Sequence, residues 1–164
     1  MNARNENADN RTAVERKSEL ELVIRRTFNG SARIVFEAWT NPELLKRWWT
    51  PKSTGMSLIS CENDVRSGGH YRFEIGQKDA KPMVFYGKYI EVIPNARLVW
   101  TNEETQDGAV TTVTFEEKNG KTLVIMHERY ASKAALDETM AGMEGGMMET
   151  FVQLDELLVT LDAR

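Results

Sequence analysis

The decisive stretch of the sequence is Val110–Leu161, VTTVTFEEKNGKTLVIMHERYASKAALDETMAGMEGGMMETFVQLDELLVTL, because its hydrophobic period changes once along it. Two runs that alternate apolar and polar residues flank Asn119-Gly120, a dipeptide typical of a two-residue hairpin turn. From Ser132 onward the apolar residues recur every three to four positions, which is typical of a helix. The stretch therefore predicts a β-hairpin followed by one long C-terminal helix that Ser132 caps.

The apolar stripe of this helix contains Leu136, Met140, Met143, Met147, Phe151, Leu154, Leu158 and Leu161. Gly142, Gly145 and Gly146 weaken its middle, each by about 1 kcal/mol relative to alanine. They indicate either close packing against a neighbouring element or a kink. The methionines are either ordinary core or the adaptable wall of an apolar pocket, since Met fits irregular surfaces well.

Upstream of this stretch, alternating runs bounded by turn residues predict five further strands. With the hairpin, the seven expected strands span residues 19–28, 56–62, 70–75, 83–93, 97–102, 110–117 and 121–128. Two short helices, 31–40 and 43–49, follow the first strand; Ser31 and Asn41-Pro42 are their start signals. This order predicts an α+β fold in which a curved seven-stranded antiparallel sheet wraps around the C-terminal helix.

Length and charge exclude several classes of protein. The chain has 164 residues, 21 basic and 25 acidic side chains and a net charge of −4, so we expect no nucleic-acid partner. No apolar run reaches the ~18 residues that a membrane-spanning helix needs, so we expect no membrane partner. Because the start of the chain is polar, we expect a disordered tail over residues 1–18 and a single domain over 19–164.

Few residues are suited to metal or nucleophilic chemistry. Cys61 is the only cysteine, which excludes an internal disulfide and a Cys-rich zinc site. No phosphate-binding glycine loop, zinc-protease motif or serine elbow is present. We therefore expect no cofactor and no metal. The absence of an export signal, together with the free thiol, favours the cytoplasm.

Three polar residues lie on strands that are otherwise apolar. Arg26 shares the apolar face of residues 19–28, where its head either reaches solvent or faces a ligand cavity. His127 follows Leu123 and Ile125 at alternating positions that we expect to face inward; it is either a satisfied buried histidine or a general base in a cavity. The parity of the long strand leaves the choice between Tyr86 and Tyr89 open.

Several strings resemble one known family. Phe28–Trp49, FNGSARIVFEAWTNPELLKRWW, resembles the opening of the activator-of-heat-shock-protein-90-ATPase homologue family, and Cys61–Phe73, CENDVRSGGHYRF, resembles its D-x-R-x-G-G-x-[WY]-x-F motif. The similarity extends over residues 19–161. It implies the START-like (SRPBCC) helix-grip fold with an internal cavity, and members that bind hydrophobic or amphipathic small molecules. Gly30-Ser31 replaces the family's usual Ala-Pro, and Met147 stands where Trp or Phe is frequent.

This reading favours binding of a hydrophobic or aromatic small molecule between the sheet and the C-terminal helix. The expected polar contacts are Arg26, Tyr86 and His127, and the expected apolar walls are Trp49, Phe73, Trp100, Phe115, Met143, Met147 and Phe151. One alternative, drawn from enzymatic branches of the superfamily, is a polyketide-cyclase-like or hydrolase-like enzyme with His127 as general acid/base and Arg26 as enolate stabiliser.

The other alternative is a stress-related or co-chaperone module that binds a chaperone or another protein through an exposed apolar patch. In each case we expect a monomer or a weak homodimer.

Overall fold

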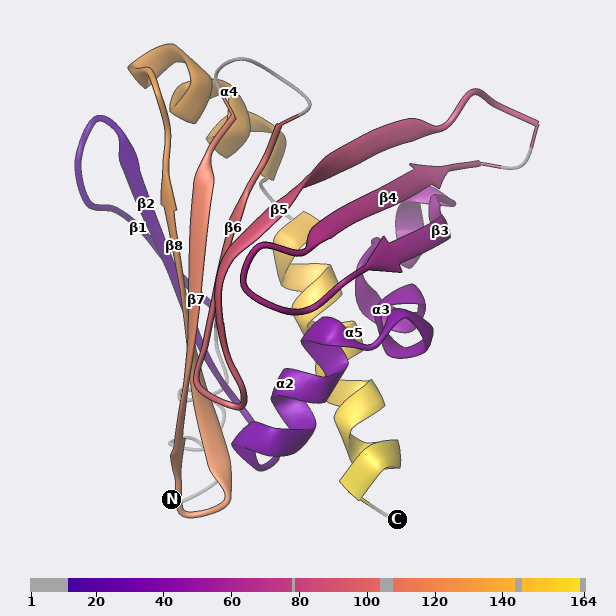
Figure 1. Cartoon of the computed structure of the whole chain (residues 1–164), viewed down its shortest axis with the longest axis vertical. Helices are drawn as coiled ribbons and strands as arrows, with labels where there is room; N and C mark the ends of the chain where they lie inside the picture. Colours follow the sequence, from indigo (N-terminus) through magenta and orange to yellow (C-terminus); the bar gives the residue numbers. More distant parts are fainter. Residues whose placement is uncertain (1–11, 78, 104–107, 144–145, 163–164) are drawn as a thin grey trace.

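The computed structural model describes residues 12–77, 79–103, 108–143 and 146–162, and gives only the helical backbone for 142–143, 146–148 and 162. One antiparallel sheet in the order β1-β2-β8-β7-β6-β5-β4-β3 curves around the helices (Figure 1). The elements are β1 Ala13–Arg16, β2 Glu21–Phe28, α2 Ala32–Thr40, α3 Pro42–Trp48, the 3-10 turn η1 Lys52–Thr54, β3 Ser57–Asn63, β4 His70–Gly76, β5 Met83–Ile93, β6 Arg97–Thr101, β7 Val110–Lys118, β8 Lys121–Arg129, α4 Lys133–Met143 and α5 Gly146–Asp162.

The seven predicted strands and both short helices are present, and their ends differ from the prediction by at most two residues. The β7–β8 hairpin turns at Asn119 and Gly120, which have φ angles of 56° and 79°. Two positive φ angles in a two-residue loop define the type I′ turn, whose twist matches that of the strands. Ser31 caps α2 by accepting a hydrogen bond from the Ile34 amide, and Asn41 caps α3 in the same way from Glu43.

The sheet has eight strands rather than seven, because Ala13–Arg16 forms an edge strand on β2. The prediction of a disordered tail over 1–18 is therefore wrong for these four residues. All four are exposed, so their sequence carries no alternating apolar signal. The strand is held by backbone pairing along β2 and by an ion pair between Arg25 and Glu15 at 3.0 Å.

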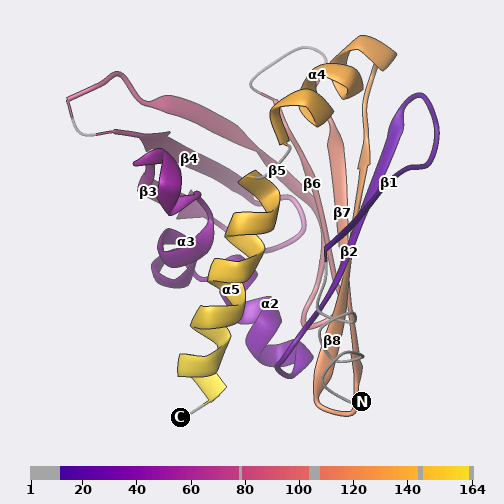
Figure 2. The same cartoon turned by 180° about the vertical axis from the view of Figure 1, so that it is seen from behind.

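Where the sequence predicts one long C-terminal helix, the structure describes two helices. α4 ends at Met143 and α5 begins at Gly146; the intervening residues lie outside the described part of the chain. Figures 1 and 2 show α4 at one end of the strands and α5 on the concave side of the sheet. Ser132 caps α4 through the amide of Ala135 at 3.1 Å, as predicted.

The core lies between the concave face of the sheet, α2, α3 and α5. Phe151 of α5 packs edge-on against Phe28 of β2 with ring centroids 5.4 Å apart, and both rings are fully buried. α5 also contacts α2 and α3; of these two helices, α2 packs against β7 and β8, and α3 packs against β3. Burying one such ring stabilises the fold by roughly 1.5–3 kcal/mol. Burial of Phe151 therefore contributes strongly to holding α5 against the sheet.

The inward face of β8 is the opposite of the predicted one. Thr122, Val124 and Met126 are buried, whereas Leu123, Ile125 and His127 are only half-buried on the outer face. Both rows of this strand are largely apolar, so hydrophobic alternation alone does not distinguish them. The register with β2, in which Val23 pairs with His127 and Ile24 with Met126, fixes the parity.

Candidate functional site

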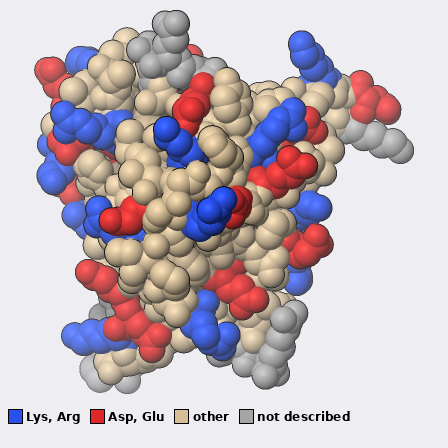
Figure 3. Space-filling model, viewed as in Figure 1, with Lys and Arg blue, Asp and Glu red and all other residues tan. Residues whose placement is uncertain are grey.

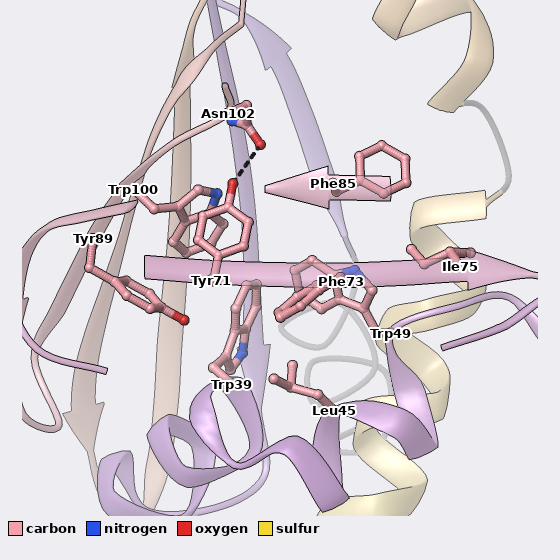
Figure 4. A pocket seen from close by; sticks show the side chains of 10 residues that line it. All are labelled: Trp39, Leu45, Trp49, Tyr71, Phe73, Ile75, Phe85, Tyr89, Trp100 and Asn102. Carbon is pink, nitrogen blue, oxygen red and sulfur yellow. Dashed lines mark hydrogen bonds between the residues drawn. The ribbon is translucent and has the colours of Figure 1, made fainter. Parts of the chain in front are cut away.

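An apolar cavity of about 210 Å³ lies between strands β4–β6 and the two short helices. Figure 4 shows the side chains that line it: Trp39, Leu45, Trp49, Tyr71, Phe73, Ile75, Phe85, Tyr89, Trp100 and Asn102. Asn102 is the one described lining residue whose side chain is neither aliphatic nor aromatic. The hydroxyl groups of Tyr71 and Tyr89 add two further polar atoms. The cavity is therefore a ring-lined space with a small polar edge.

On the helical side of the cavity, Trp39 contacts all three of the other tryptophan rings. Its centroid lies 5.0 Å from that of Trp48, 6.0 Å from Trp49 and 6.4 Å from Trp100. Edge-to-face and tilted pairs of this kind add roughly 0.5–1.5 kcal/mol each beyond area burial. Trp39 is 4% exposed, and its indole N–H has no hydrogen-bond partner in the described part of the chain. A buried donor without a partner is uncommon, so the Trp39 indole adds an unsatisfied polar group to the packing next to the cavity.

The sheet side of the cavity depends on the pairing of Tyr71 with Gly87. A Cβ atom at Gly87 would lie 2.0 Å from the Thr101 carbonyl oxygen and 3.0 Å from the Tyr71 ring. Glycine therefore allows β6 to approach β5 closely beneath the Tyr71 ring. The Tyr71 hydroxyl then donates to the Thr101 carbonyl oxygen at 2.5 Å and lies 3.3 Å from Asn102 Oδ1.

The position of Tyr89 shows which side chains of β5 face the cavity. It is 4% exposed and lines the cavity, whereas Tyr86 is 45% exposed on the outer face, so the prediction of Tyr86 as a cavity contact is wrong. The Tyr89 hydroxyl accepts a hydrogen bond from Asn63 Nδ2 at 3.4 Å. Burial raises the pKa of Tyr89 to about 12, so this hydroxyl remains neutral.

Three of the predicted apolar walls, Trp49, Phe73 and Trp100, line the cavity together. Phe115 and Phe151 do not line it; each contacts Trp39 from the core, at 6.1 and 6.2 Å. The side chains of Met143 and Met147 lie outside the described residues. Among the residues whose side chains are described, the sheet and the two short helices supply the walls, and no described α5 side chain lines the cavity.

Arg26 faces inward but does not line this cavity. It is 9% exposed and forms an ion pair with Asp155 of α5, while its second terminal nitrogen donates to Thr12 Oγ1 at 3.0 Å. Its guanidinium carbon lies 5.5 Å from the Phe28 ring centroid. Burial raises the pKa of Asp155, and the hydrogen bond from Arg26 opposes that rise. In the structure Arg26 therefore ties α5 to β2.

His127 lies on the outer face of the sheet. Its Nε2 atom is 2.9 Å from Glu21 Oε1, and its side chain is 31% exposed. The hydrogen bond with His127, supported by Ser18, lowers the pKa of Glu21. A cyclase or hydrolase mechanism that needs His127 and Arg26 in one cavity does not match this placement, and the prediction that His127 faces inward is wrong.

Sequence reasoning missed several lining residues. Tyr71 and Ile75 lie at alternating positions with Phe73 in the predicted strand 70–75, and Trp39 lies in the predicted helix 31–40, but nothing in the sequence singles them out as pocket walls. Asn102 carries no sequence signal, because it simply follows a short strand. The Asp64–Gly69 motif forms a turn: Arg66 pairs with Asp64 at 2.7 Å, and Gly68 has a φ of 89°.

Other site classes find no support in the described part of the chain. Within it, no group of three or more His, Cys, Asp or Glu residues is placed to hold a metal ion. No helix among the described residues is long and apolar enough to cross a membrane. Burial raises the pKa of the Cys61 thiol to about 11, so it is protonated near neutral pH. On the face in Figure 3, acidic and basic side chains are interspersed.

A curved antiparallel sheet wrapped around a C-terminal helix, with an aromatic cavity on its concave side, defines a helix-grip protein. The chain belongs to the family described as "Activator of Hsp90 ATPase homolog 1-like protein", whose profile matches residues 29–159. A search of curated proteins found no match.

Solved structures share the fold over almost their whole length. A protein of Rhodobacter sphaeroides is 24% identical with a TM-score of 0.84, and the match covers 92% of this chain and 99% of that one. A protein of Nitrosomonas europaea is 23% identical with a TM-score of 0.80, covering 89% and 98%. An AHSA1-like protein of Aeromonas hydrophila is 20% identical with a TM-score of 0.70, covering 84% and 93%. At these identities the likeness is one of fold.

Proposed function

We propose that this protein binds a hydrophobic, ring-containing small molecule in the cavity between β4–β6 and the short helices. The observation that carries the proposal is the lining itself, in which Trp39, Trp49, Phe73 and Trp100 converge on one apolar cavity. Small-molecule sites are typically concave and apolar, with a few polar groups that fix orientation. Asn102 and the hydroxyl groups of Tyr71 and Tyr89 supply the polar groups among the lining residues here.

The size of the cavity limits the ligand. Its volume is about 210 Å³, somewhat more than the ~150 Å³ of an engineered apolar cavity that takes up benzene. One ring, or two fused rings, fills such a space. A larger molecule needs a second space next to this one or a movement of the walls.

The test is a titration of the wild-type chain with single-ring and fused-ring probes such as toluene and 1-naphthol, followed by calorimetry. Three of the four tryptophans line the cavity, so their fluorescence provides a second readout. Ile75→Phe fills part of the space and should weaken binding at least tenfold. Val159→Phe, on the exposed side of α5, is the matched control. Equal binding by both variants, or no saturable binding by the wild type, contradicts the proposal.

Membership of the family is compatible with binding of either a small molecule or a protein. The enzymatic alternative required Arg26 and His127 in one cavity, and the two residues lie on opposite faces of the sheet. The co-chaperone alternative, the monomeric or weakly dimeric state and the cytoplasmic location stay predictions that binding and localisation experiments must test.

A further inference from the structure

A second cavity, of about 530 Å³, adjoins the first. The two share Phe85 and Asn102 as lining residues. The second cavity is completed by residues near the ends of β7 and β8 and by α4: Gly108, Ala109, Glu128, Tyr130, Ser132, Ala134, Ala135, Glu138 and Thr139. An aromatic compartment thus opens beside a more polar one.

A chain of hydrogen bonds on the inner face of the sheet connects the two compartments. Asn102 Nδ2 donates to the Ala109 carbonyl at 2.8 Å and to Thr111 Oγ1 at 3.4 Å. The Thr111 hydroxyl donates in turn to Glu128 Oε2 at 3.2 Å. Tyr130 donates to the other carboxyl oxygen, Oε1, also at 3.2 Å. The bonds from Asn102 to Thr111 and from Thr111 to Glu128 run in one direction and Tyr130 also donates to Glu128, so the network ends on an acceptor.

The Glu128 carboxylate retains acceptor capacity for a ligand. An ionised carboxylate offers about four acceptor sites, and an ammonium group carries three donors and no acceptor. Thr111 and Tyr130 occupy one site on each oxygen. No other described residue donates a side-chain hydrogen bond to Glu128, so acceptor sites remain for donors from a molecule in the cavity.

The charges around this compartment have one sign. Glu128 and Glu138 are the charged residues among its described lining, which contains no Lys, Arg or His. Lys133, at the start of α4, pairs with Asp137 at 2.9 Å. His127 and Arg129 flank Glu128 along β8, and the strand alternation turns both to the outer face. The cavity is therefore complementary to a cation.

The strand register gives the spacing between the two compartments. Trp100 pairs with Thr111, and Thr111 pairs with Glu128, so the two residues lie two strands apart on one face. Neighbouring strands lie ~4.8 Å apart, which separates Trp100 from Glu128 by roughly 10 Å. A ring linked to an amine by about four carbons spans that distance.

We infer that the two cavities form one site for an amphipathic amine, whose ring lies among Trp49, Phe73 and Trp100 and whose ammonium group binds the Glu128 carboxylate. The inference rests on the proposed function, because the ring uses the same aromatic cavity. Burial raises the pKa of Glu128, and the hydrogen bonds from Tyr130 and Thr111 oppose that rise. A bound ammonium group supplies the charge that keeps this carboxylate ionised.

The first test compares 4-phenylbutylamine with 4-phenylbutan-1-ol and 5-phenylpentanoate, three probes with the same ring and nearly the same length. Calorimetry with the wild-type chain near neutral pH should rank the amine first, at least about tenfold tighter than the alcohol, and the carboxylate last. Equal affinity of amine and alcohol overturns the inference and leaves the proposed function standing. If no probe binds, both fall.

The second test removes the charge at constant shape. Glu128→Gln should lower amine affinity by roughly tenfold or more and leave alcohol affinity within about twofold. Glu116→Gln, an exposed change of the same charge on β7, should alter neither. If Glu128→Gln weakens both probes equally, the carboxylate does not select the amine. Should that variant fail to fold, the ranking of the three probes by the wild-type chain decides alone.

Discussion

The Gly87→Ala variant tests whether position 87 needs glycine because space is lacking for a Cβ atom, rather than because of its backbone angles. Gly87 is absent from the glycines with positive φ, so alanine can adopt its backbone angles. Such a replacement would normally stabilise a protein by about 0.4–1 kcal/mol, because it restricts the unfolded chain. The added Cβ would, however, stand 2.0 Å from the Thr101 carbonyl oxygen. Any loss of stability therefore measures the close approach of β5 and β6.

The size of the loss follows from the contacts around Thr101. An ordinary Cβ contact begins near 3.4 Å, so Thr101 must retreat by about 1.4 Å. That movement breaks the bond from the Tyr71 hydroxyl to the Thr101 carbonyl and strains the one from the Glu103 amide to Tyr86. At about 1 kcal/mol for each bond, with overpacking of similar size, the expected cost is about 2–4 kcal/mol.

Urea unfolding of the wild type and the variant measures this cost directly. Gly120→Ala is the matched control: its φ is 79°, yet nothing lies within 4 Å of its added Cβ. That change should cost only about 1 kcal/mol, because its penalty is purely conformational. If Gly87→Ala is as stable as the wild type, or costs less than Gly120→Ala, the steric argument is refuted.

Three further predictions concern buried ionisable groups. Asp155→Asn leaves the Arg26 guanidinium buried without its counter-ion, and should lower the free energy of unfolding by about 3 kcal/mol in urea titrations. Cys61, whose pKa is raised to about 11, should react with iodoacetamide at mildly alkaline pH on the order of 100-fold more slowly than an unperturbed thiol. Binding of 4-phenylbutylamine should strengthen as pH rises through the pKa of Glu128, because only the ionised carboxylate pairs with the amine. Burial raises this pKa above the usual value of about 4.3. The affinity for 4-phenylbutan-1-ol should not change with pH, and parallel pH curves for the two probes would contradict the assignment.

Local signals predicted most of the fold. The span of β5 was predicted to the residue, Met83–Ile93, because Lys81-Pro82 and Pro94-Asn95 bound a long run of β-forming residues. The Asn119-Gly120 turn was equally well determined, since few dipeptides accept two positive φ angles. These features depend on residues close in sequence, and they need no knowledge of the neighbouring elements.

Features that depend on a partner element were missed. β1 is only four residues long and exposed throughout, and it forms because β2 offers it an unpaired edge. The parity of β8 was inverted, because the row with Leu123 and Ile125 is as apolar as the row that is buried. Trp49 was predicted as a wall of the cavity, but Trp39 and Leu45, which also approach from the short helices, were not. Only tertiary packing distinguishes these possibilities.

The bend of the sheet and the chemistry of the proposed site both depend on the place near Gly87 where β5 changes its partner strand. Up to Lys88, β5 pairs with β4; from Tyr89 it pairs with β6, and Figure 1 shows it joining the two parts of the sheet. Gly87 lies at this change of partner and lets Thr101 lie against the Tyr71 ring. The next residue, Asn102, thereby enters both cavities and starts the hydrogen-bond chain toward Glu128. A variant that moves β6 away from β5 should therefore lose stability and amine selectivity together.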